Sequence, residues 1–383
     1  MRVKSALTQR VQPYRAGMEL AAELGEIKPE LVLVFTSIHY AADFATLHAG
    51  LMDGLPGAKP LVVGCTGDGV YESDRLANHG ISALALTSDG TVRWQAALRR
   101  GIFGDVASVA ESCARAAGGA DASFALVFAE GTKGNGGAVL DGVKRVLTCP
   151  FAGGMAGDDR HLEHSWVFLD GEAAEEAVVV LTAHGDFRFA LHTASGWNPV
   201  GDEGVVESCT ANVVERISGM SAMEFYREQI GAVPGEMDIG LIPLAEYPSG
   251  SDGNPILHTI VNMNLMTGDI TVLGAIPKGT FVRVCQATRE DVLNGVDGAM
   301  AGVQQAGIEP AGMLMVSCAG RRWILGERWR EEVSRIHALL GTTIPLAGFP
   351  SFGEVGPFRK AADGLYTPSY LHSNSCVLWM IGK

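Results

Sequence analysis

The 383-residue chain has the composition of a well-packed globular protein, because 47% of its residues are hydrophobic and only 19% are charged. Its net charge of −14 argues against nucleic acid or a membrane surface as a partner, since both need clustered lysines and arginines. No apolar run approaches the roughly 18 residues of a membrane helix, and no signal-peptide pattern follows the first residues. Seven scattered cysteines without a C-x-x-C pair are typical of a reducing compartment, so we expect a cytoplasmic protein.

A short helix is predicted over residues 15–25, and after it a β-α-β-loop unit occurs three times along the chain. Each unit begins with an apolar strand (LVLVF, FALVF, MLMVS) and ends in a glycine-rich loop closed by an acid (GCTGDG, GGMAGDD, GFPSFGEVG). We name these ends glycine-acid loops 1, 2 and 3, and they contain Gly67-Asp68, Gly157-Asp158 and Gly353-Glu354 respectively. Repeated sequence units imply repeated folds, so the three loops are expected at equivalent places.

Two strands joined by a tight turn are expected after loops 1 and 2. The turns are Ser88-Asp89-Gly90 and His184-Gly185-Asp186, and such steps between apolar runs predict β-hairpins. A third hairpin is expected around Thr267-Gly268-Asp269. Further helices are predicted over residues 105–117, from residue 221, over 289–306 and over 326–341.

Parallel crossovers combined with hairpins predict an α/β protein whose sheets are mixed, with helices packed on the sheets. The segment GWNPVGDEG, which starts at residue 196, is rich in glycine, proline and acid and predicts a domain boundary. We therefore expect two domains, with the first two repeat units in residues 1–200 and the third in residues 201–383.

The loop acids Asp68, Asp158, Asp159 and Glu354 have two interpretations. Each acid alone is more typical of a tight turn, in which the carboxylate accepts backbone N–H groups. Loops at the carboxyl ends of strands, however, line a crevice in many α/β proteins, where acids meet an amine or cation of a ligand. For the three loops together we favour the ligand-binding interpretation.

Histidine and cysteine side chains offer other chemistry. His372 enters the last strand after loop 3, and a core histidine is as good an interpretation as a ligand-facing residue or haem ligand. Cys65 in loop 1 and Cys318, beside Arg321 and Arg322, are candidate nucleophiles, since neighbouring positive charge favours a thiolate. No positioned base accompanies either cysteine, so we interpret both as core or pocket lining.

Two further motifs have weaker implications. The glycines of AEGTKGNGG, with Lys133, could let backbone amides cradle a carboxylate or phosphate, although a flexible surface loop is an equally good interpretation. His161 and His164 are spaced i and i+3 but lack a third ligand pattern, so we interpret them as a solvated pair.

The three loops, together with GWNPVG, ANVVERISG and LHSN, resemble the FIST family. The motifs VFTS, VVGCTGDG, VFAEGTKGN, FAGGMAGDD and SWVFLDG correspond to its N-terminal portion. IPKGTFVRV, VSCAGRR, GFPSFGEVGP and LHSN correspond to its C-terminal portion. The resemblance covers nearly the whole chain, but VNMNLMTGD has no arginine where the family often places one.

The resemblance implies a cytoplasmic sensory protein that binds a small molecule, with amino acids as suggested ligands. Because no kinase or receptor segment is found in the chain, the signal is expected to pass to a separate partner such as a histidine kinase, and a homo-oligomer is left open. A subgroup of the family binds haem and senses nitric oxide, so one alternative is a haem-based sensor with His372 as the axial ligand of the iron. The other alternative is a Cys-dependent hydrolase or lyase.

The expected ligand-binding residues lie in the loops and at strand ends: Thr36, Ser37, Cys65, Thr66, Asp68, Gly154, Asp158, Arg321, Arg322, Gly353, Glu354, His372 and Asn374.

Overall fold

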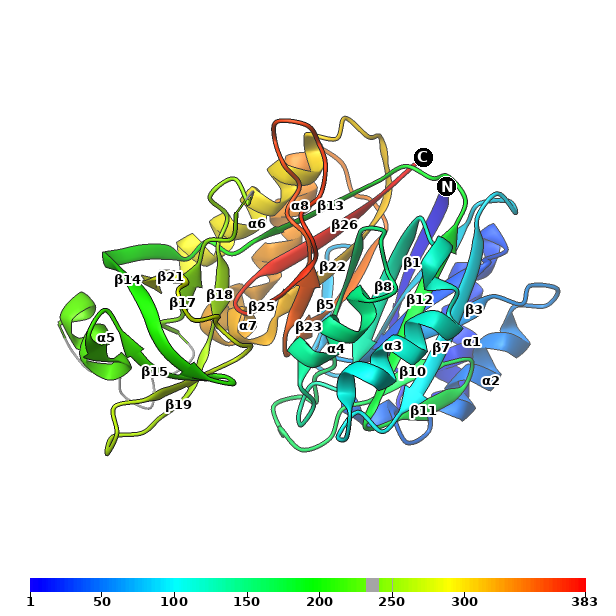
Figure 1. The fold of residues 1–383 in the computed structure, drawn as a ribbon. Coiled ribbons are helices and arrows are strands. Elements are labelled where there is room, and N and C mark those ends of the chain that lie inside the picture. The colour runs from blue at the N-terminus through cyan, green and yellow to red at the C-terminus, as the bar shows by residue number, and fades with distance from the viewer. Residues whose placement is uncertain (232–240, 250) are drawn as a thin grey trace.

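The computed structural model describes residues 1–231, 241–249 and 251–383. It has two lobes, a large one that contains residues 1–197 and 287–383 and a small one formed by the segment between them (Figure 1). The two chain ends lie side by side on the large lobe, where the amino group of Met1 donates to the carbonyl of Gly382 at 3.2 Å. The predicted fold class is confirmed, since the protein is α/β with several mixed sheets.

The large lobe, all of whose residues the structure describes, contains three six-stranded sheets, and each sheet holds the parallel strand pair of one repeat unit. The first sheet runs in the order β1 (Arg2–Thr8), β6 (Ile81–Thr87), β2 (Leu31–Thr36), β3 (Leu61–Thr66), β10 (Val167–Leu169), β11 (Glu172–Ala174). The second runs β7 (Arg93–Arg100), β12 (Ala177–His184), β8 (Phe124–Ala129), β9 (Phe151–Met155), β24 (Glu354–Gly356), β25 (Tyr370–His372). The third runs β13 (Phe189–Ala194), β26 (Cys376–Gly382), β22 (Pro310–Cys318), β23 (Leu346–Ser351), β4 (Val70–Glu72), β5 (Arg75–Ala77).

Each glycine-acid loop carries the chain out of its own sheet into another one. After loop 1, the pair β4-β5 joins β23 of the third unit. After loop 2, β10-β11 joins β3 of the first unit, and after loop 3, β24-β25 joins β9 of the second. The three units therefore interlock in a ring, and the prediction that the three loops occupy equivalent places is confirmed.

The same exchange explains why two predicted hairpins are wrong. Asp89 and Gly90 have φ values of 53° and 85°, as a tight turn requires, yet β6 pairs with β1 and β2 whereas β7 pairs with β12. In the same way β12 pairs with β7 and β8, whereas β13 pairs with β26. The turns are present, but the two strands that each turn joins belong to different sheets, so they do not pair as a hairpin. The third predicted hairpin is confirmed, because β19 (Ile260–Met263) pairs with β20 (Ile270–Val272).

A shared hydrophobic core fills the space between the three sheets. Phe35 of β2, Phe128 of β8 and Phe349 of β23 meet at its centre, one from each repeat unit, with ring centroids 4.7 to 5.9 Å apart. All three rings are fully buried, and aromatic side chains of this size bury more apolar surface than any other residue type. The core therefore joins the three units into one body.

A glycine in the second strand of each unit allows the parallel pair to approach closely. A Cβ atom at Gly64, Gly153 or Gly348 would lie 1.7 to 1.9 Å from the carbonyl oxygen of its register partner, which is Val34, Val127 or Met315 respectively. No L side chain fits at that distance. This contact explains why the motif before each loop contains a glycine.

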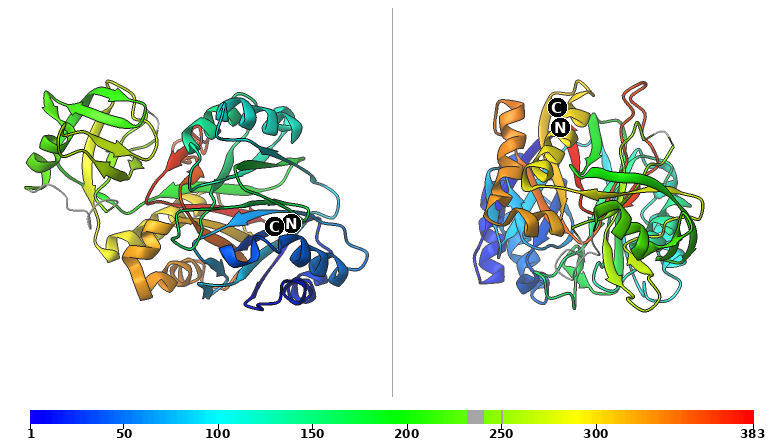
Figure 2. Two further views of the ribbon diagram at one scale, coloured as in Figure 1. Left: turned by 90° about the horizontal axis from the view of Figure 1, so that it is seen from below. Right: turned by 90° about the vertical axis from the view of Figure 1, so that its left-hand side faces the viewer.

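Helices cover the outer faces of the three sheets (Figure 2). They pack in pairs: α1 (Pro13–Leu24) on α2 (Phe44–Gly54), α3 (Val106–Ala116) on α4 (Gly136–Lys144), and α6 (Arg289–Gln304) on α8 (Glu331–Leu340). Shorter helices are α7 (Ala319–Leu325), η1 (Gly25–Ile27), η2 (Ile38–Tyr40), η3 (Gly119–Asp121) and η4 (Gly326–Arg330). The predicted helices are confirmed, except that residues 326–330 form the 3-10 helix η4 before α8 begins. None of the helices in the described ranges has the length and apolar character that crossing a membrane requires.

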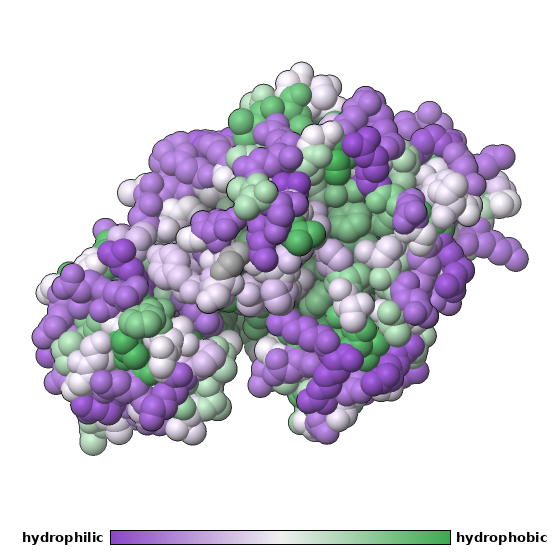
Figure 3. Space-filling model, turned by 45° about the horizontal axis from the view of Figure 1, so that its top comes forward, coloured by the Kyte–Doolittle hydropathy of each residue, from purple (hydrophilic) through white to green (hydrophobic). Residues whose placement is uncertain are grey.

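In its described residues, the small lobe is a curved sheet with helix α5 (Ala222–Ile230) against it. Its strands run in the order β18 (Ile256–His258), β17 (Leu244–Glu246), β21 (Phe281–Gln286), β14 (Asn198–Thr210), β15 (Val213–Ile217), β20, β19, with β16 (Met220–Ser221) beside β15 and helix α5 packed on β14. The boundary expected at residues 200–201 falls inside β14. In space the third repeat unit packs with the first two, because its strands complete their ring, and the space-filling view shows a hollow between this body and the small lobe (Figure 3).

Candidate functional site

The three glycine-acid loops contact one another at the centre of the ring. The amide of Asp68 in loop 1 donates to the carbonyl of Pro350 at 2.9 Å, and the amide of Gly157 in loop 2 donates to the carbonyl of Thr66 at 3.0 Å. The amide of Met155 donates to the carbonyl of Gly353 in loop 3 at 2.8 Å. Each loop is thus bonded to both others, so the acids they carry are held in fixed positions.

Asp158 of loop 2 stabilises its own loop by accepting backbone N–H groups, as is typical of an acid in a tight turn. Its side chain is fully buried and accepts backbone N–H groups of Leu162, Glu163 and His164 at 2.7 to 3.1 Å. Its carbonyl also contacts Nδ1 of His161, which together with His164 is exposed on this loop. The carboxylate of Asp158 is therefore occupied by its own loop.

Asp68 of loop 1 has a different environment, because its partners are side chains of the third repeat unit. The indole N–H of Trp323 donates to Oδ2 at 2.6 Å, and Nη1 of Arg322 lies 3.1 Å from Oδ1. Nε of Arg160, from loop 2, lies 3.7 Å from Oδ2. Arg322 also donates to the side chain of Asn78 at 2.7 Å and stacks 4.5 Å over the ring of Trp329. Asp68 thus joins segments from all three units.

A cavity of about 620 Å³ lies above this cluster, and we name it the loop cavity. Its wall consists of Asp68, Leu76, Asn78, His79, Asp159, Arg160, Arg322, Gly326, Glu327, Trp329 and Arg330. Three of these residues are carboxylates and three are arginines, so the wall offers both signs of charge. Among the described residues, the exposed guanidinium of Arg330 makes no hydrogen bond or ion pair, which leaves it available to an anionic group.

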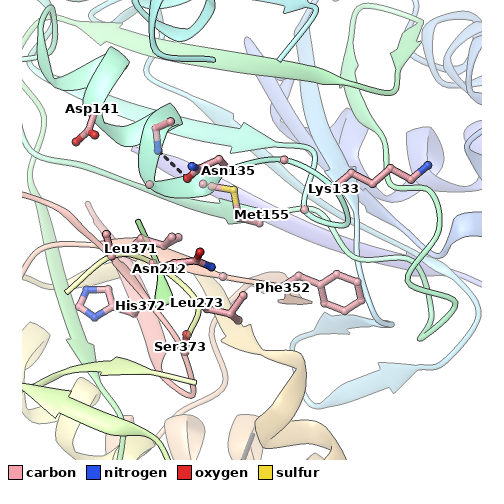
Figure 4. Close-up of a pocket in the computed structure, with 18 of the residues that line it drawn as sticks. Lys133, Asn135, Asp141, Met155, Asn212, Leu273, Phe352, Leu371, His372 and Ser373 are labelled. Carbon is pink, nitrogen blue, oxygen red and sulfur yellow. Dashed lines mark hydrogen bonds between the residues drawn. The ribbon is translucent and has the colours of Figure 1, made fainter. Parts of the chain in front are cut away.

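A second cavity of about 370 Å³ lies between the two lobes, and we name it the inter-lobe cavity (Figure 4). Loop 3 contributes Phe352 and Gly353, and the small lobe contributes Asn212 and Leu273. The glycine-rich segment before α4 forms its other wall, but the amides of residues 132–134 already have a partner. Glu130 accepts the N–H groups of residues 132–134 at 2.7 to 3.1 Å, so the loop binds a carboxylate of its own chain.

His372 does not have the environment that an axial haem ligand needs. The residue is 1% exposed, and its Nε2 contacts the carbonyl oxygen of Gly356 at 2.9 Å. Burial lowers the pKa of the imidazole to about 4, and the ring of Phe358 packs against it with centroids 5.2 Å apart. His372 lines the inter-lobe cavity, but a haem iron bound at Nε2 would have to replace the Gly356 contact, so the residue as placed does not fit the group.

The two candidate nucleophiles are also enclosed. Cys65 is completely buried in the central core, and this burial raises the pKa of its thiol well above the usual value. Burial raises the pKa of Cys318 far more than the neighbouring charge of Arg321 lowers it. The expectation that adjacent arginines favour a thiolate at Cys318 is therefore wrong, because removal from water is the larger effect.

Arg321 forms a buried ion pair and does not reach a cavity wall. Its guanidinium is fully buried and pairs with Glu332 at 2.9 Å. It also donates to the carbonyls of Ser195 and Val292 at 2.5 and 2.7 Å. Glu332 in turn accepts from the hydroxyl of Tyr71 at 2.8 Å. The network explains the presence of a buried arginine without a ligand, whereas Arg322 is the arginine that faces the loop cavity.

Glu354 of loop 3 is fully buried at the start of β24, which pairs with β25 and β9. It accepts the amide and hydroxyl of Ser375 at 3.1 and 3.0 Å, and burial raises the pKa of its carboxyl to about 8. The other expected residues stand near the loop junction. Thr66 donates its hydroxyl to the carbonyl of Gly157 at 2.6 Å, and Ser37 accepts the amide of Gly80 at 3.3 Å. Buried residues at or next to these loops are Thr36, Gly154 and Asn374.

The sequence analysis did not identify His79, which lines the loop cavity, or His39, which packs against His79. His39 follows β2 in η2, and His79 lies in the turn between β5 and β6. Their rings are 4.7 Å apart, and Nδ1 of His39 lies 3.7 Å from Oδ2 of Asp159. These residues are 40 and 80 positions apart in the chain, so no local motif connects them. Only their positions just after the ends of β2 and β5 could have indicated from the sequence that they lie close together.

Two protein-family models match this chain in the same order as the sequence motifs. The FIST N domain model matches residues 30–220 and the FIST C domain model matches residues 222–357. Uncharacterized proteins of Mycobacterium tuberculosis (strain H37Rv) and Mycobacterium bovis are 24% and 25% identical over 217 and 226 residues, which are 54% and 55% of this chain. The matched segments cover 55% and 57% of those proteins, so the chain spans about half the length of the curated relatives it matches.

Solved structures give a weaker likeness. A cyanuric acid hydrolase is similar at a TM-score of 0.35 with 10% identity, over 100% of this chain and 99% of that chain. The cyanuric acid hydrolase from A. caulinodans is similar at a TM-score of 0.32 with 11% identity, over the same shares of both chains. The two domain models together match most of the chain, and FIST domains are in general sensory domains that bind ligands in signalling. This chain belongs to the FIST family.

Proposed function

We propose that this chain is a cytoplasmic sensory protein that binds a small zwitterionic molecule, such as an amino acid, in the loop cavity. The single observation that carries this proposal is the paired charge of the cavity wall. Arg330 and Arg160 offer guanidinium groups to a carboxylate, and Glu327 and Asp159 offer carboxylates to an amine. Charge-assisted hydrogen bonds of this kind are roughly twice as strong as neutral ones.

The position of the cavity supports the same proposal. Its wall takes residues from loop 1, from loop 2 and from the α7-η4 segment of the third unit, so a ligand there would contact all three repeat units. Trp329 adds an aromatic surface, and ligand sites generally combine apolar walls with a few fixed polar groups. Binding would therefore change the contacts between units, which a separate signalling partner such as a histidine kinase would detect.

A screen of thermal unfolding tests the ligand class. The purified protein is heated with a panel of amino acids, matched carboxylates and matched amines, each at the same concentration. A ligand that binds only the folded state raises the unfolding temperature, because binding adds stability by mass action. We expect zwitterions to raise it, and the matched single-charge compounds to raise it less.

Variants then locate the site by isothermal titration with the best ligand. Arg330→Ala should weaken binding by at least about tenfold, since a hydrogen bond to a charged group contributes roughly 1.5–3 kcal/mol. Arg115→Ala is the matched control, because Arg115 is an exposed arginine on α3 that pairs with Glu111. Equal affinities of the wild type and Arg330→Ala for every ligand that binds would contradict the proposed site.

A further inference from the structure

Two imidazoles and one carboxylate converge beside the loop cavity. The ligand-type atoms of His39, His79 and Asp159 all lie within 4.8 Å of one another. They come from three segments at the carboxyl ends of strands, η2 after β2, the turn after β5 and loop 2 after β9. Because His39 and His79 are exposed, their side chains can close the remaining distance to a common ion by rotation.

One oxygen of the Asp159 carboxylate is buried without a hydrogen-bond partner. The side chain is only 8% exposed, and the oxygen without a partner is Oδ1. Oδ2 accepts the amide of Ile38 at 2.9 Å, which fixes the direction of the carboxylate. A buried oxygen of an acid normally has a donor or a cation beside it. His39 approaches the other oxygen of the same carboxylate, with Nδ1 3.7 Å from Oδ2, so Oδ1 stays open beside the two imidazoles.

We propose that His39, His79 and Asp159 bind a divalent transition-metal ion, with zinc as the best fit. Two imidazole nitrogens and one carboxylate oxygen form a ligand set that transition metals prefer over Mg²⁺ or Ca²⁺, which favour oxygen ligands alone. The hydrogen bond from Ile38 to Oδ2 is the kind of outer contact that orients a metal-binding carboxylate. Three protein ligands leave the fourth position of a tetrahedral zinc open.

This inference goes beyond the proposed function, and it shares Asp159 with the proposed ligand site, so a bound ion would leave Glu327 as the carboxylate for the ligand's amine. His79 and Asp159 also line the loop cavity, so a bound metal would add positive charge at its edge. Metal uptake is measured without any organic ligand, and ligand binding is measured with and without metal. Failure of one proposal is therefore distinguishable from failure of the other.

Equilibrium dialysis against ZnCl₂, followed by elemental analysis, tests the site on the full chain. We expect one zinc per wild-type chain and no uptake of Mg²⁺ from MgCl₂ under the same conditions. His79→Ala and Asp159→Asn should each weaken zinc binding by at least about tenfold, because loss of mere outer-shell partners already costs 10–100-fold. Asn suits position 159, since φ is 55° there and Asn tolerates this left-handed conformation.

A matched control and a spectroscopic readout complete the test. His164→Ala removes another exposed histidine, one that pairs with Glu175 outside the cluster, and should retain full zinc uptake. Co²⁺ should give the visible absorption of a tetrahedral site in the wild type and lose it in His79→Ala, with circular dichroism unchanged. The proposal is overturned if the wild type takes up no zinc, or if the His79→Ala and His164→Ala proteins bind zinc equally.

Discussion

Removal of the Arg321 guanidinium should lower the free energy of unfolding strongly, although Arg321 does not contact a ligand. The Arg321→Met variant leaves Glu332 as an unpaired charge in the core and removes the donors to the carbonyls of Ser195 and Val292. Breaking a buried ion pair by removing one partner typically costs about 3–5 kcal/mol. Because Glu332 also accepts from Tyr71, whose hydroxyl accepts from Trp329 of the loop-cavity wall, the loss should loosen that wall as well.

Urea denaturation of the two single variants and the double variant measures this effect. Arg321→Met and Glu332→Gln should each lower the free energy of unfolding by about 3–5 kcal/mol, and the double variant should recover part of the loss because no unpaired charge remains. The control Arg115→Ala breaks an exposed i,i+4 pair and should leave the free energy of unfolding nearly unchanged. A fully stable Arg321→Met protein that has lost ligand binding would refute the structural role and restore Arg321 as a ligand contact.

Three further predictions follow from the packing and the buried titratable groups. Gly64→Ala should destabilise the fold by about 1–3 kcal/mol or more in urea denaturation, whereas Gly104→Ala should not, because a Cβ meets the Val34 carbonyl at position 64 and nothing within 4 Å at position 104. Glu354 is protonated in the folded protein up to about pH 8 but is ionised in the unfolded chain above about pH 4.5. The free energy of unfolding should therefore fall as the pH rises from 4.5 to 8, by at most about 5 kcal/mol, and Glu354→Gln should flatten this pH dependence in urea denaturation. Haem added to the purified protein should give the same absorption spectrum with wild type and His372→Ala, and a Soret band that this substitution abolishes would argue against the reasoning.

The repeated units were predictable because each one combines an apolar strand, a glycine and an acid in the same order. Those features report local geometry, such as the close approach of Gly64 to Val34 and the tight turn at Asp89. The partner of each outgoing strand was not predictable, because Asp-Gly turns fix how the chain reverses but not which sheet receives it. Closure of three sheets around Phe35, Phe128 and Phe349 decides the pairing, and that is a property of the whole chain.

The candidate site divides in the same way. Asp68 and Arg322 were predicted from their places at strand ends, and they do meet at the loop cavity. Arg321 stands next to Arg322 in the sequence but points into the core, because adjacent residues on the short helix α7 face different directions. His39, His79 and Arg330 have no motif around them. His39 and His79 meet through the fold of the first unit, and His79 and Arg330 line one cavity because the third unit packs against the first, so neither arrangement could be read from the sequence.

A crystal structure of the protein with its best zwitterionic ligand tests the central claim most directly. The ligand should lie in the loop cavity, with its carboxylate on Arg330 and its amine facing Asp159 or Glu327. Density for the same ligand in the inter-lobe cavity beside Asn212 and Phe352, with the loop cavity free of it, would contradict the proposal.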